Sequence, residues 1–216
     1  MKKFLIVGVS QRIDYIQEYG EYRDAIDQRL IHWMKDIGFI PIPIPNSLID
    51  LDKDTSLKNQ VNLMNWLNAS GVNGIILSGG NNIGEMATRD KTEKFLLNWA
   101  KKLQIPVLGI CRGMQMIGVY SGVDLIEVSG HVKTSHNLVF KGNDHSLFPK
   151  SVNSYHNCSI EKCPEKFQVL AESEDGNIEA IKHIKLPWEG WMWHPEREGS
   201  FCYEDIKRAK NLFKLN

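Results

Sequence analysis

The feature that most constrains the fold is the stretch 105–118, in which an apolar run meets a cysteine placed between two glycines. Residues 105–110 are almost wholly apolar, as is typical of a buried strand in a parallel sheet. Gly109 and Gly113 lie two residues before and two residues after Cys111, which is the spacing of a nucleophile elbow, a sharp strand-to-helix turn. The pattern predicts a thiol at a helix N-terminus, where the helix dipole favours the thiolate. A buried structural cysteine in a tight turn is the alternative interpretation.

The order of apolar and polar segments around this stretch predicts the fold class. Strands are expected at 4–9, 39–45, 72–77 and 105–110, and helices at 23–37, 61–69, 88–102 and 112–120, with a loop at 10–20. Such alternation indicates an α/β fold: three layers, with a flavodoxin-like, mostly parallel central sheet and helices on both faces. Shorter strands at 123–128, 138–141, 152–155, 167–172, 178–183 and 190–193 predict a mixed or antiparallel C-terminal extension of this sheet. A helix at 203–215 closes the chain.

Composition excludes several classes of protein. The 216 residues favour a single domain spanning 1–216. Lysine and arginine balance aspartate and glutamate at 26 each, so nothing favours binding to nucleic acid or to a membrane surface. No apolar run approaches the roughly 18 residues of a membrane-spanning helix. Four irregularly spaced cysteines do not resemble a disulfide framework, which predicts a reducing, cytoplasmic setting.

A thiol nucleophile in a hydrolase needs a base, a group that orients the base, and donors for the oxyanion. His194 ends an apolar stretch, and Glu196 follows it by two residues, where a carboxylate can set the tautomer of the imidazole. The alternative is a surface histidine near acids.

Two glycines also follow a buried strand whose end should lie beside Cys111, because ligands in such sheets bind beyond the carboxyl ends of the strands. The N–H groups of Gly80 and Arg112 are therefore candidates for an oxyanion hole. A flexible strand–helix turn is the alternative interpretation of Gly79 and Gly80.

Four motifs, in this order along the chain, resemble the class I glutamine amidotransferase superfamily. They are Ser78-Gly79-Gly80, Gly109-Ile-Cys-Arg-Gly-Met-Gln115, Asn153-Ser-Tyr-His156 and His194-Pro-Glu196. The stretches 22–29 and 178–181 are similar to the γ-glutamyl hydrolase branch of the superfamily, peptidase C26. The resemblance runs from about residue 4 to residue 196.

The resemblance implies a role for each matching position. Cys111 would form a γ-glutamyl thioester, with His194 as its acid/base partner and Glu196 orienting the imidazole. Gly80 and Arg112 would supply the oxyanion N–H groups. Substrate-binding roles are implied for Gly79, Gln115, Ser154 and Tyr155, the last two holding the glutamyl carboxylate mainly through backbone. No metal or organic cofactor is expected.

The leaving group is open, because the segments expected to contact it depart from the usual pattern of the branch. Residues 81–85 lack the usual Asp and Pro, and 46–59 is short. The size of the chain and the stretch 23–29 resemble compact hydrolases of a γ-glutamyl nucleotide amidate, γ-glutamyl-CDP-amidate, in the synthesis of capsule phosphoramidate groups. Arg12, Arg89 and Lys133 could meet a diphosphate, although solvated surface charge is the favoured interpretation.

The partner expected from these motifs is a small γ-glutamyl molecule, and a homodimer is compatible with the sequence. One alternative is a glutaminase subunit that passes ammonia to a separate synthetase. Another is a hydrolase of γ-glutamyl-γ-aminobutyrate. A third is a non-catalytic protein with Cys111 as a sensor thiol, against which His194 and Glu196 argue.

Other cysteines and histidines carry weaker signals. Cys158 and Cys163, with His156 nearby, could hold zinc, but the missing second ligand pair favours ordinary buried thiols. His131, His136 and His145 lie in a loop-rich stretch, where solvated histidines are favoured over residues at a pocket mouth.

Overall fold

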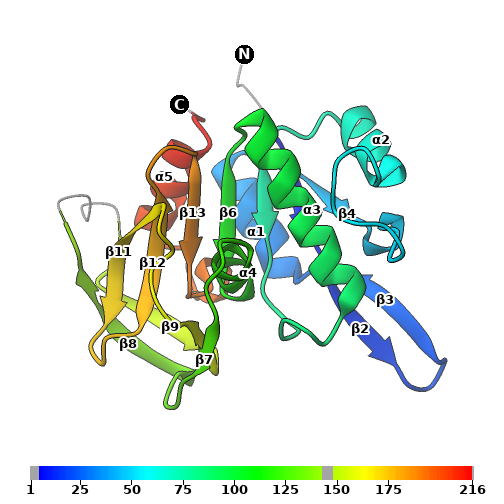
Figure 1. Cartoon of the computed structure of the whole chain (residues 1–216). Coiled ribbons are helices and arrows are strands. Elements are labelled where there is room, and N and C mark those ends of the chain that lie inside the picture. The colour runs from blue at the N-terminus through cyan, green and yellow to red at the C-terminus, as the bar shows by residue number, and fades with distance from the viewer. Residues whose placement is uncertain (1–4, 143–147, 216) are drawn as a thin grey trace.

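A layered α/β arrangement extends over residues 5–142 and 148–215, the part of the chain that the computed structural model describes (Figure 1). The described helices are α1 (Gln28–Ile37), α2 (Val61–Ser70), α3 (Ala87–Leu103), α4 (Arg112–Tyr120) and α5 (Tyr203–Leu212). The described strands are β1 (Leu5–Ser10), β2 (Arg12–Ile16), β3 (Glu21–Ala25), β4 (Phe39–Ile44), β5 (Ile75–Leu77), β6 (Val107–Ile110), β7 (Leu125–Glu127), β8 (Val132–Phe140), β9 (Ser151–Tyr155), β10 (Cys158–Ile160), β11 (Phe167–Ser173), β12 (Ile178–His183) and β13 (Trp188–Trp191). Single turns of 3₁₀ helix span Asn46–Leu48 and Pro195–Arg197.

The central sheet has nine strands in the order β4-β1-β5-β6-β13-β12-β11-β8-β9. The first five strands pair in parallel, and β12 and the strands beyond it pair antiparallel. Numbered among themselves in chain order, the five parallel strands follow 2-1-3-4-5, the flavodoxin-like order. The predicted fold class, with its antiparallel C-terminal extension, is therefore confirmed.

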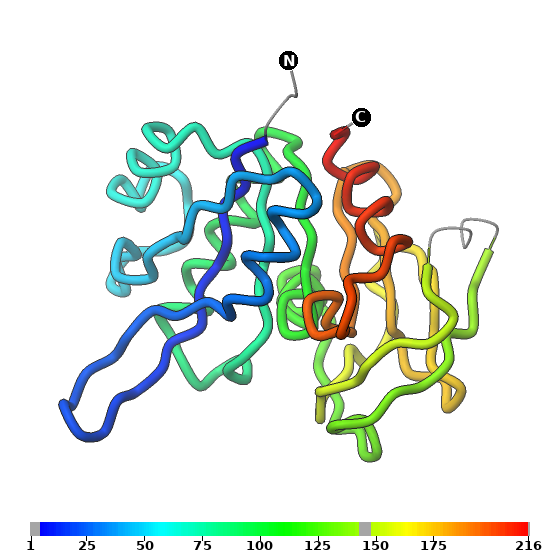
Figure 2. Tube along the Cα trace, turned by 180° about the vertical axis from the view of Figure 1, so that it is seen from behind, coloured from blue at the N-terminus to red at the C-terminus, as the bar shows by residue number. Residues whose placement is uncertain are grey.

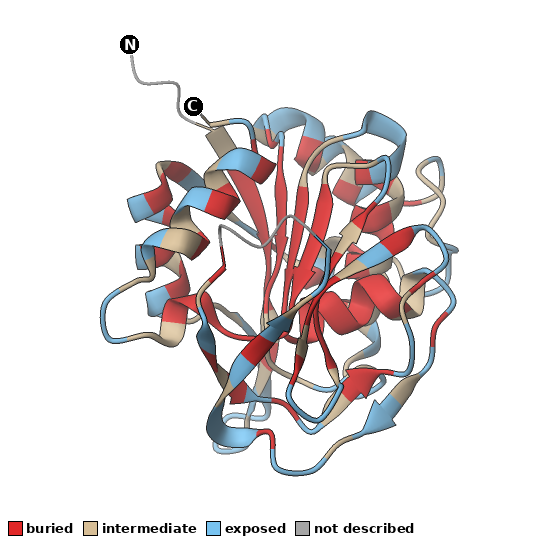
Figure 3. Ribbon diagram, turned by 90° about the vertical axis from the view of Figure 1, so that its left-hand side faces the viewer, coloured by how far each residue is buried: buried red, intermediate tan, exposed pale blue. Residues whose placement is uncertain are grey.

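Two apolar cores fill the space between the sheet and its helices. Leu63 of α2, Phe95 of α3 and Met114 of α4 belong to the core on one face. Trp33 of α1 and Ala209 of α5 belong to the core on the opposite face. Figure 2, seen from behind, shows α1 and α5 on that face. The central strands β5, β6 and β13 are buried along their whole length, whereas the helices expose their outer faces (Figure 3). Burial on both sides explains why the sequence is almost continuously apolar at these strands.

The prediction of a loop at residues 10–20 is wrong. This segment forms most of an antiparallel hairpin, in which β2 pairs with β3 from Arg12↔Ala25 to Ile16↔Glu21. The predicted helix at 23–37 consequently begins later, at Gln28, where the Asp27 side chain accepts a hydrogen bond from the N–H of Arg29. The hairpin extends away from the sheet in Figure 1, and the periodicity of 10–20 was obscured because both of its faces are largely solvated.

The C-terminal extension also differs in detail from the prediction. β7 leaves the main sheet and pairs with β10 in a separate two-stranded sheet. β8 begins at Val132, six residues before the predicted strand, and α5 ends at Leu212 rather than at residue 215. His145 lies outside the described residues. None of the described helices is long and apolar enough to cross a membrane.

Candidate active site

Cys111 occupies a sharp turn between β6 and α4, as the glycine spacing predicts. Its backbone has φ 50° and ψ −106°, a strained conformation for a residue with a side chain. A Cβ atom at Gly109 would lie 2.5 Å from the carbonyl carbon of Gly113, and one at Gly113 would lie 2.1 Å from the carbonyl oxygen of Leu77. Both glycines are therefore required for close packing of β6, α4 and β5, and this packing presents the sulfur at the start of the helix.

His194 follows β13, the neighbour of β6 in the sheet, so its imidazole lies at the same edge as Cys111. Its Nδ1 is 2.6 Å from Oε1 of Glu196, and both side chains are almost fully buried. Asn153 fixes the backbone of His194, accepting from its N–H at 3.0 Å and donating to its carbonyl at 2.8 Å. The sequence predicted the pair of side chains, and it placed Asn153 in a motif without assigning it a role.

Burial by itself would lower the pKa of His194, but hydrogen bonds with Cys111 and Glu196 outweigh this effect and raise the pKa to about 9. At neutral pH the imidazole is consequently protonated. A carboxylate that accepts from Nδ1 leaves the Nε2–H for the sulfur. The three side chains thus lie together, with the charged ring of His194 in contact with both Cys111 and Glu196.

Gly79 lies directly against the imidazole. A Cβ atom at this position would be 2.5 Å from Cε1 of His194, which no real side chain tolerates. The backbone there is not in the left-handed region, so the requirement for glycine is the space that His194 occupies. The space taken by His194 is thus enough to explain why position 79 must be glycine, without the predicted contact between Gly79 and the substrate.

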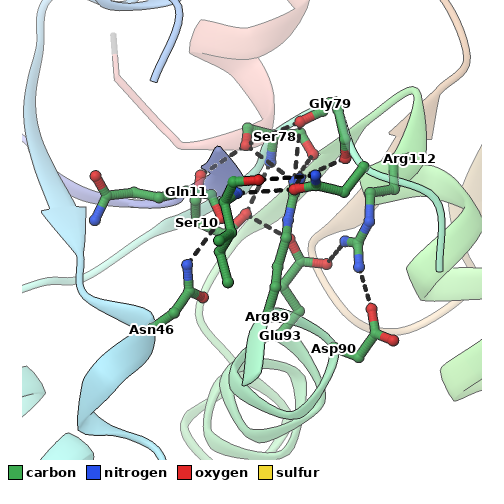
Figure 4. A network of polar contacts seen from close by, with 12 residues as sticks. Ser10, Gln11, Asn46, Ser78, Gly79, Arg89, Asp90, Glu93 and Arg112 are labelled. Atoms are coloured by element: carbon green, nitrogen blue, oxygen red, sulfur yellow. Dashed lines mark hydrogen bonds and ion pairs between the residues drawn. The ribbon is translucent and has the colours of Figure 1, made fainter. Parts of the chain in front are cut away.

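The turn after β5 is held from behind by Arg89 of α3, as Figure 4 shows. Its guanidinium donates to the carbonyl oxygens of Ser78 at 2.7 Å, Gly79 at 2.9 Å, and Gly80. All described peptide bonds are trans, and in a trans peptide the C=O and the following N–H point in opposite directions. Because Arg89 binds the Gly79 carbonyl, the N–H of Gly80 points away from Arg89, and Gly80 lines the cavity that contains Cys111.

A buried ion-pair network ties this turn to the elbow (Figure 4). Glu93 is fully buried and pairs with both Arg89 and Arg112, while Arg112 also pairs with Asp90. Burial would raise the pKa of Glu93, but Arg112 and Arg89 outweigh it and hold the pKa below its ordinary value. The side chain of Arg112 thus faces α3, which leaves its backbone N–H as the group at the elbow.

The stretch 22–29, which resembles the γ-glutamyl hydrolase branch, has a positioning role. Asp24 accepts from the N–H and the side-chain amide of Asn46. Arg29 donates to the carbonyl oxygens of Glu196, at 2.8 Å, and Glu198. The stretch therefore fixes the 3₁₀ turn that carries Glu196, and does not itself line the cavity beside Cys111.

A cavity of about 420 Å³ opens above the thiol. Besides Cys111 and His194, its lining includes Gly80, Asn81, Arg112, Gln115, Tyr155, His156 and Arg197. Gln115 donates to the carbonyl oxygen of Cys158 at 2.8 Å, and Arg197 stacks over the Tyr155 ring at 4.6 Å. Ser154 lies behind this wall, since its buried hydroxyl donates to the carbonyl oxygen of His131. Arg197 was not predicted from the sequence.

Several weaker predictions are corrected by burial. Arg89, expected as a solvated or diphosphate-binding cation, is fully buried. Lys133 is exposed, as expected, and Arg12 is 41% exposed beside Asp14. His131 and His136, expected as solvated loop histidines, have side chains only 5% and 11% exposed. His136 lies within β8, opposite Val152 of β9. His131 directly precedes β8, and its carbonyl accepts a hydrogen bond from the N–H of His156, so neither residue lies in an open loop.

Comparison with known proteins agrees with these observations. The peptidase C26 family matches residues 5–196. A γ-glutamyl-CDP-amidate hydrolase from Campylobacter jejuni is 30% identical over 226 aligned positions, covering 98% of each chain. A glutamine-hydrolyzing GMP synthase subunit from Archaeoglobus fulgidus is 30% identical over 192, covering 86% of this chain and 88% of that one. A solved glutamine amidotransferase from Thermotoga maritima shares the fold, with a TM-score of 0.60 at 19% identity, covering 97% and 84% of the two chains.

The motif order, the α/β sheet and the family match all lead to one assignment. The resemblance noted in the sequence is confirmed over nearly the whole chain. The chain belongs to the peptidase C26 family and is a cysteine-type hydrolase of glutamine or γ-glutamyl amide bonds.

Proposed function

We propose that Cys111, His194 and Glu196 are the catalytic triad of this hydrolase. The observation that carries the proposal is the strained backbone of Cys111 beside a buried His194 that is held by Glu196 at 2.6 Å. Strain at a non-glycine residue persists only where the surroundings enforce it, and it clusters at functional sites. The protonated imidazole places a positive charge beside Cys111, and reactive cysteines are typically found in such electropositive surroundings.

The chemistry takes two steps. The Cys111 thiolate attacks the γ-carbonyl carbon, and the oxygen takes up negative charge, which the N–H groups of Gly80 and Arg112 stabilise. The C–N bond then breaks, and the leaving nitrogen takes a proton from His194. In the second step His194 removes a proton from water, which attacks the thioester and releases glutamate and the thiolate.

Backbone contacts at the elbow support this assignment of donors. The N–H of Cys111 itself donates to the carbonyl oxygen of Trp191 at 2.7 Å, so it cannot serve the oxyanion. Arg112 is the first residue of α4, and the first N–H groups of a helix have no partner within it. Gly80 presents the second N–H from the turn that Arg89 holds.

The glutamyl head is assigned to the wall that contains Gln115 and Tyr155, with Ser154 directly behind it. Gln115 follows Cys111 by about one helical turn and lines the cavity, and Tyr155 lies at right angles to the His194 ring at 5.9 Å. A zwitterionic head needs donors and acceptors together, which the amide of Gln115 and the backbone of residues 154–155 supply. Gly79 serves this wall only indirectly, by leaving room for His194.

We further propose that the leaving group is a nucleotide amidate, as in γ-glutamyl-CDP-amidate. A relative covering 98% of both chains carries that activity in its name. Arg197 lines the cavity, and Arg12 lies against Gly80, 3.1 Å from the position of a Cβ atom there. A guanidinium group that lines the cavity and an arginine beside Gly80 suit an anionic diphosphate better than the neutral ammonia released from glutamine. Capsule phosphoramidate synthesis is the pathway that such a substrate would serve.

A substrate screen tests this proposal. Glutamate release is measured with γ-glutamyl-CDP-amidate, γ-glutamyl-γ-aminobutyrate, a γ-glutamyl folate and free glutamine. The nucleotide amidate is expected to have the highest kcat/KM, and Cys111→Ala is expected to release no glutamate from any of them. Full activity of Cys111→Ala would overturn the triad, whereas a preference for γ-glutamyl-γ-aminobutyrate would overturn only the leaving group.

A matched pair of variants sharpens the assignment of the leaving group. Arg12→Gln is expected to raise KM for the nucleotide amidate and to leave KM for free glutamine unchanged. Arg23→Gln removes the same charge from an exposed position of the same hairpin. This variant is expected to leave KM unchanged for both the nucleotide amidate and free glutamine. Equal effects of Arg12→Gln on both substrates would contradict a diphosphate contact.

A second candidate is a glutaminase subunit that supplies ammonia to a separate synthetase. The observation in its favour is the 30% identity to a glutamine-hydrolyzing component of GMP synthase. Hydrolysis of free glutamine that occurs only when a purified synthetase is present would favour this function. Turnover of γ-glutamyl conjugates by the chain alone would favour the first.

The remaining organisation is proposed from the same observations. Residues 1–216 are taken as a single domain that acts on a small molecule, with a homodimer compatible with this activity. The four cysteines are free, which supports the proposal of a reducing, cytoplasmic setting.

A further inference from the structure

Three histidines surround one buried carboxylate behind the wall of the active-site cavity. Glu179, on β12, is fully buried. Its Oε1 lies 3.2 Å from Nε2 of His136, 3.5 Å from Nε2 of His156 and 3.9 Å from Nδ1 of His131. The His131 ring packs against the other two, with centroids 5.1 Å from His136 and 4.7 Å from His156.

The carboxylate reaches this position because β12 carries an extra residue there. Glu172 of β11 pairs with Ile178 and Ala171 pairs with Ala180, which leaves Glu179 without a partner in the ladder. Such a bulge re-aims the side chain of the extra residue and is common beside functional sites. Within the described residues, neither oxygen of Glu179 receives a hydrogen bond.

His131 is held from outside the cluster at one ring nitrogen and faces Glu179 with the other. Its Nε2 lies 2.9 Å from Oδ2 of Asp175 and 3.3 Å from Nδ2 of Asn177. Its Nδ1 lies 3.9 Å from Oε1 of Glu179 and 3.5 Å from Oγ of Ser154. A buried carboxylate that receives no hydrogen bond is unfavourable unless a positive charge lies beside it.

His156 repeats the arrangement from the other side. Its Nδ1 donates to the carbonyl oxygen of Cys158 at 3.1 Å, because a carbonyl can only accept. Its Nε2 is the ring nitrogen that faces Glu179. A ring nitrogen that donates to an oxygen while the other faces a shared centre is the usual state of a metal-bound histidine.

We propose that His131, His136, His156 and Glu179 form a binding site for a divalent transition-metal ion, with Zn²⁺ the best fit. The ligand atoms of His131, His136 and Glu179 lie within 4.8 Å of one another, and His156 reaches the same carboxylate oxygen. Zinc bonds of about 2.0–2.2 Å in a tetrahedron place ligand atoms about 3.4 Å apart. The three ring nitrogens lie 3.2, 3.5 and 3.9 Å from Oε1 of Glu179, which is near this spacing. Nitrogen-rich sets with one carboxylate suit zinc better than Mg²⁺ or Ca²⁺.

The ion would join three strands at the wall of the active-site cavity. His131 and His136 lie at β8, Glu179 on β12, and His156 follows β9 and lines the cavity. The proposed metal site is thus a positioning site, separate from the proposed triad. It differs from the expectation drawn from the sequence, which was that no metal is bound. Its existence does not depend on the proposed substrate, because binding is measured without one.

Equilibrium dialysis against Zn²⁺, with metal content measured by atomic emission, tests the site. The Cys111→Ala variant serves as the starting protein, so that the active-site thiolate cannot hold zinc. One Zn²⁺ per chain is expected, together with a rise in Tm over the chelator-treated protein. Absence of stoichiometric Zn²⁺ binding would overturn the proposal.

A matched pair of exposed variants tests the assignment without endangering the core. Asp175→Asn, at a side chain 54% exposed, removes the acceptor that fixes His131 and is expected to weaken Zn²⁺ binding by about 10–100-fold. Glu174→Gln removes the same charge from the adjacent exposed position and is expected to leave the affinity unchanged. Equal affinities of the two variants would contradict the role of His131.

Direct replacement of a ligand and spectroscopy complete the test. Glu179→Gln is expected to weaken binding at least as much as Asp175→Asn. X-ray absorption of the Zn²⁺-loaded Cys111→Ala protein applies even if Glu179→Gln does not fold. Imidazole scattering with only nitrogen and oxygen neighbours is expected, and a sulfur neighbour, which would indicate Cys158 or Cys163, would overturn the ligand set.

Discussion

Single residues at the candidate active site are chosen by the space around them. Gly79 leaves room for the imidazole of His194, and Gly109 and Gly113 allow α4 to pack against β5 and β6. Cys111 adopts the strained backbone of the turn. The positions of the reacting atoms therefore depend on the glycines that leave space, as well as on the side chains that make contacts.

Gly79→Ala tests this control by space. The added methyl group would meet Cε1 of His194 at 2.5 Å, so the imidazole must move, and a displacement of about 1 Å costs on the order of 10²-fold in kcat. Steady-state kinetics measure the loss, and circular dichroism checks the fold. Gly199→Ala is the matched control, because nothing lies within 4 Å of its Cβ position. Wild-type kcat in Gly79→Ala would contradict the close contact.

The protonation state of His194 predicts a pH profile. With a pKa raised to about 9, the imidazolium that protonates the leaving nitrogen is present at neutral pH and is lost as pH rises through about 9. The alkaline limb of kcat/KM should therefore have an apparent pKa near 9. Glu196→Gln removes a carboxylate that favours the charged ring, so this limb should move to lower pH. An unchanged limb in Glu196→Gln would show that another group controls it.

At the scale of elements, α3 fixes the site from behind the sheet edge. Arg89 binds the turn after β5, and Glu93 and Asp90 bind the side chain of Arg112 at the start of α4. Both proposed oxyanion N–H groups are thus attached to a single helix. Because one helix binds both turns, the two N–H donors keep a fixed distance and orientation relative to each other. A preorganised oxyanion hole requires such a fixed arrangement.

Arg89→Lys tests this positioning role. Lysine keeps the charge opposite Glu93, but its single ammonium group cannot bind three carbonyl oxygens in the fixed geometry of a guanidinium. We expect kcat to fall by about 10–100-fold, less than the 10²–10³-fold loss of a whole oxyanion donor, with KM changed little. Arg23→Lys on the exposed hairpin is the control. A lower Tm with unchanged kcat would indicate that Arg89 has only a structural role.

At the scale of the whole molecule, the sequence predicted what depends on local pattern. The α/β sheet followed from apolar runs and the elbow from Gly109 and Gly113. The proposed triad followed from the spacing of His194 and Glu196 together with the family resemblance. Arg89 and Glu93 could not be predicted as buried ions, because charged residues on a helix resemble a solvated face until the partner turn is known. His131 and His136 were misjudged for the same reason, since Glu179 lies more than 40 residues later in the chain.

A buried aspartate predicts how stability depends on pH. Burial, opposed by a hydrogen bond from Trp193, raises the pKa of Asp205 to about 7. The folded state holds this proton more tightly than the unfolded state. The protonated carboxyl group therefore contributes fully to the free energy of unfolding below about pH 4, and this contribution is lost as pH rises to about 7. Asp205→Asn should therefore be more stable than wild type at pH 8, by about 1–3 kcal/mol. Urea unfolding at pH 4 and pH 8 measures the difference, and equal gains at both would contradict the assignment.

The central claim is that Cys111 carries the γ-glutamyl group during turnover. Mass spectrometry of the intact protein, quenched in acid during hydrolysis of a γ-glutamyl substrate, tests it most directly. We predict a mass increase of one glutamyl group that peptide mapping assigns to Cys111 and that decays as substrate is exhausted. A glutamyl group on another residue, or rapid glutamate release by a protein that lacks the Cys111 thiol, would contradict the account.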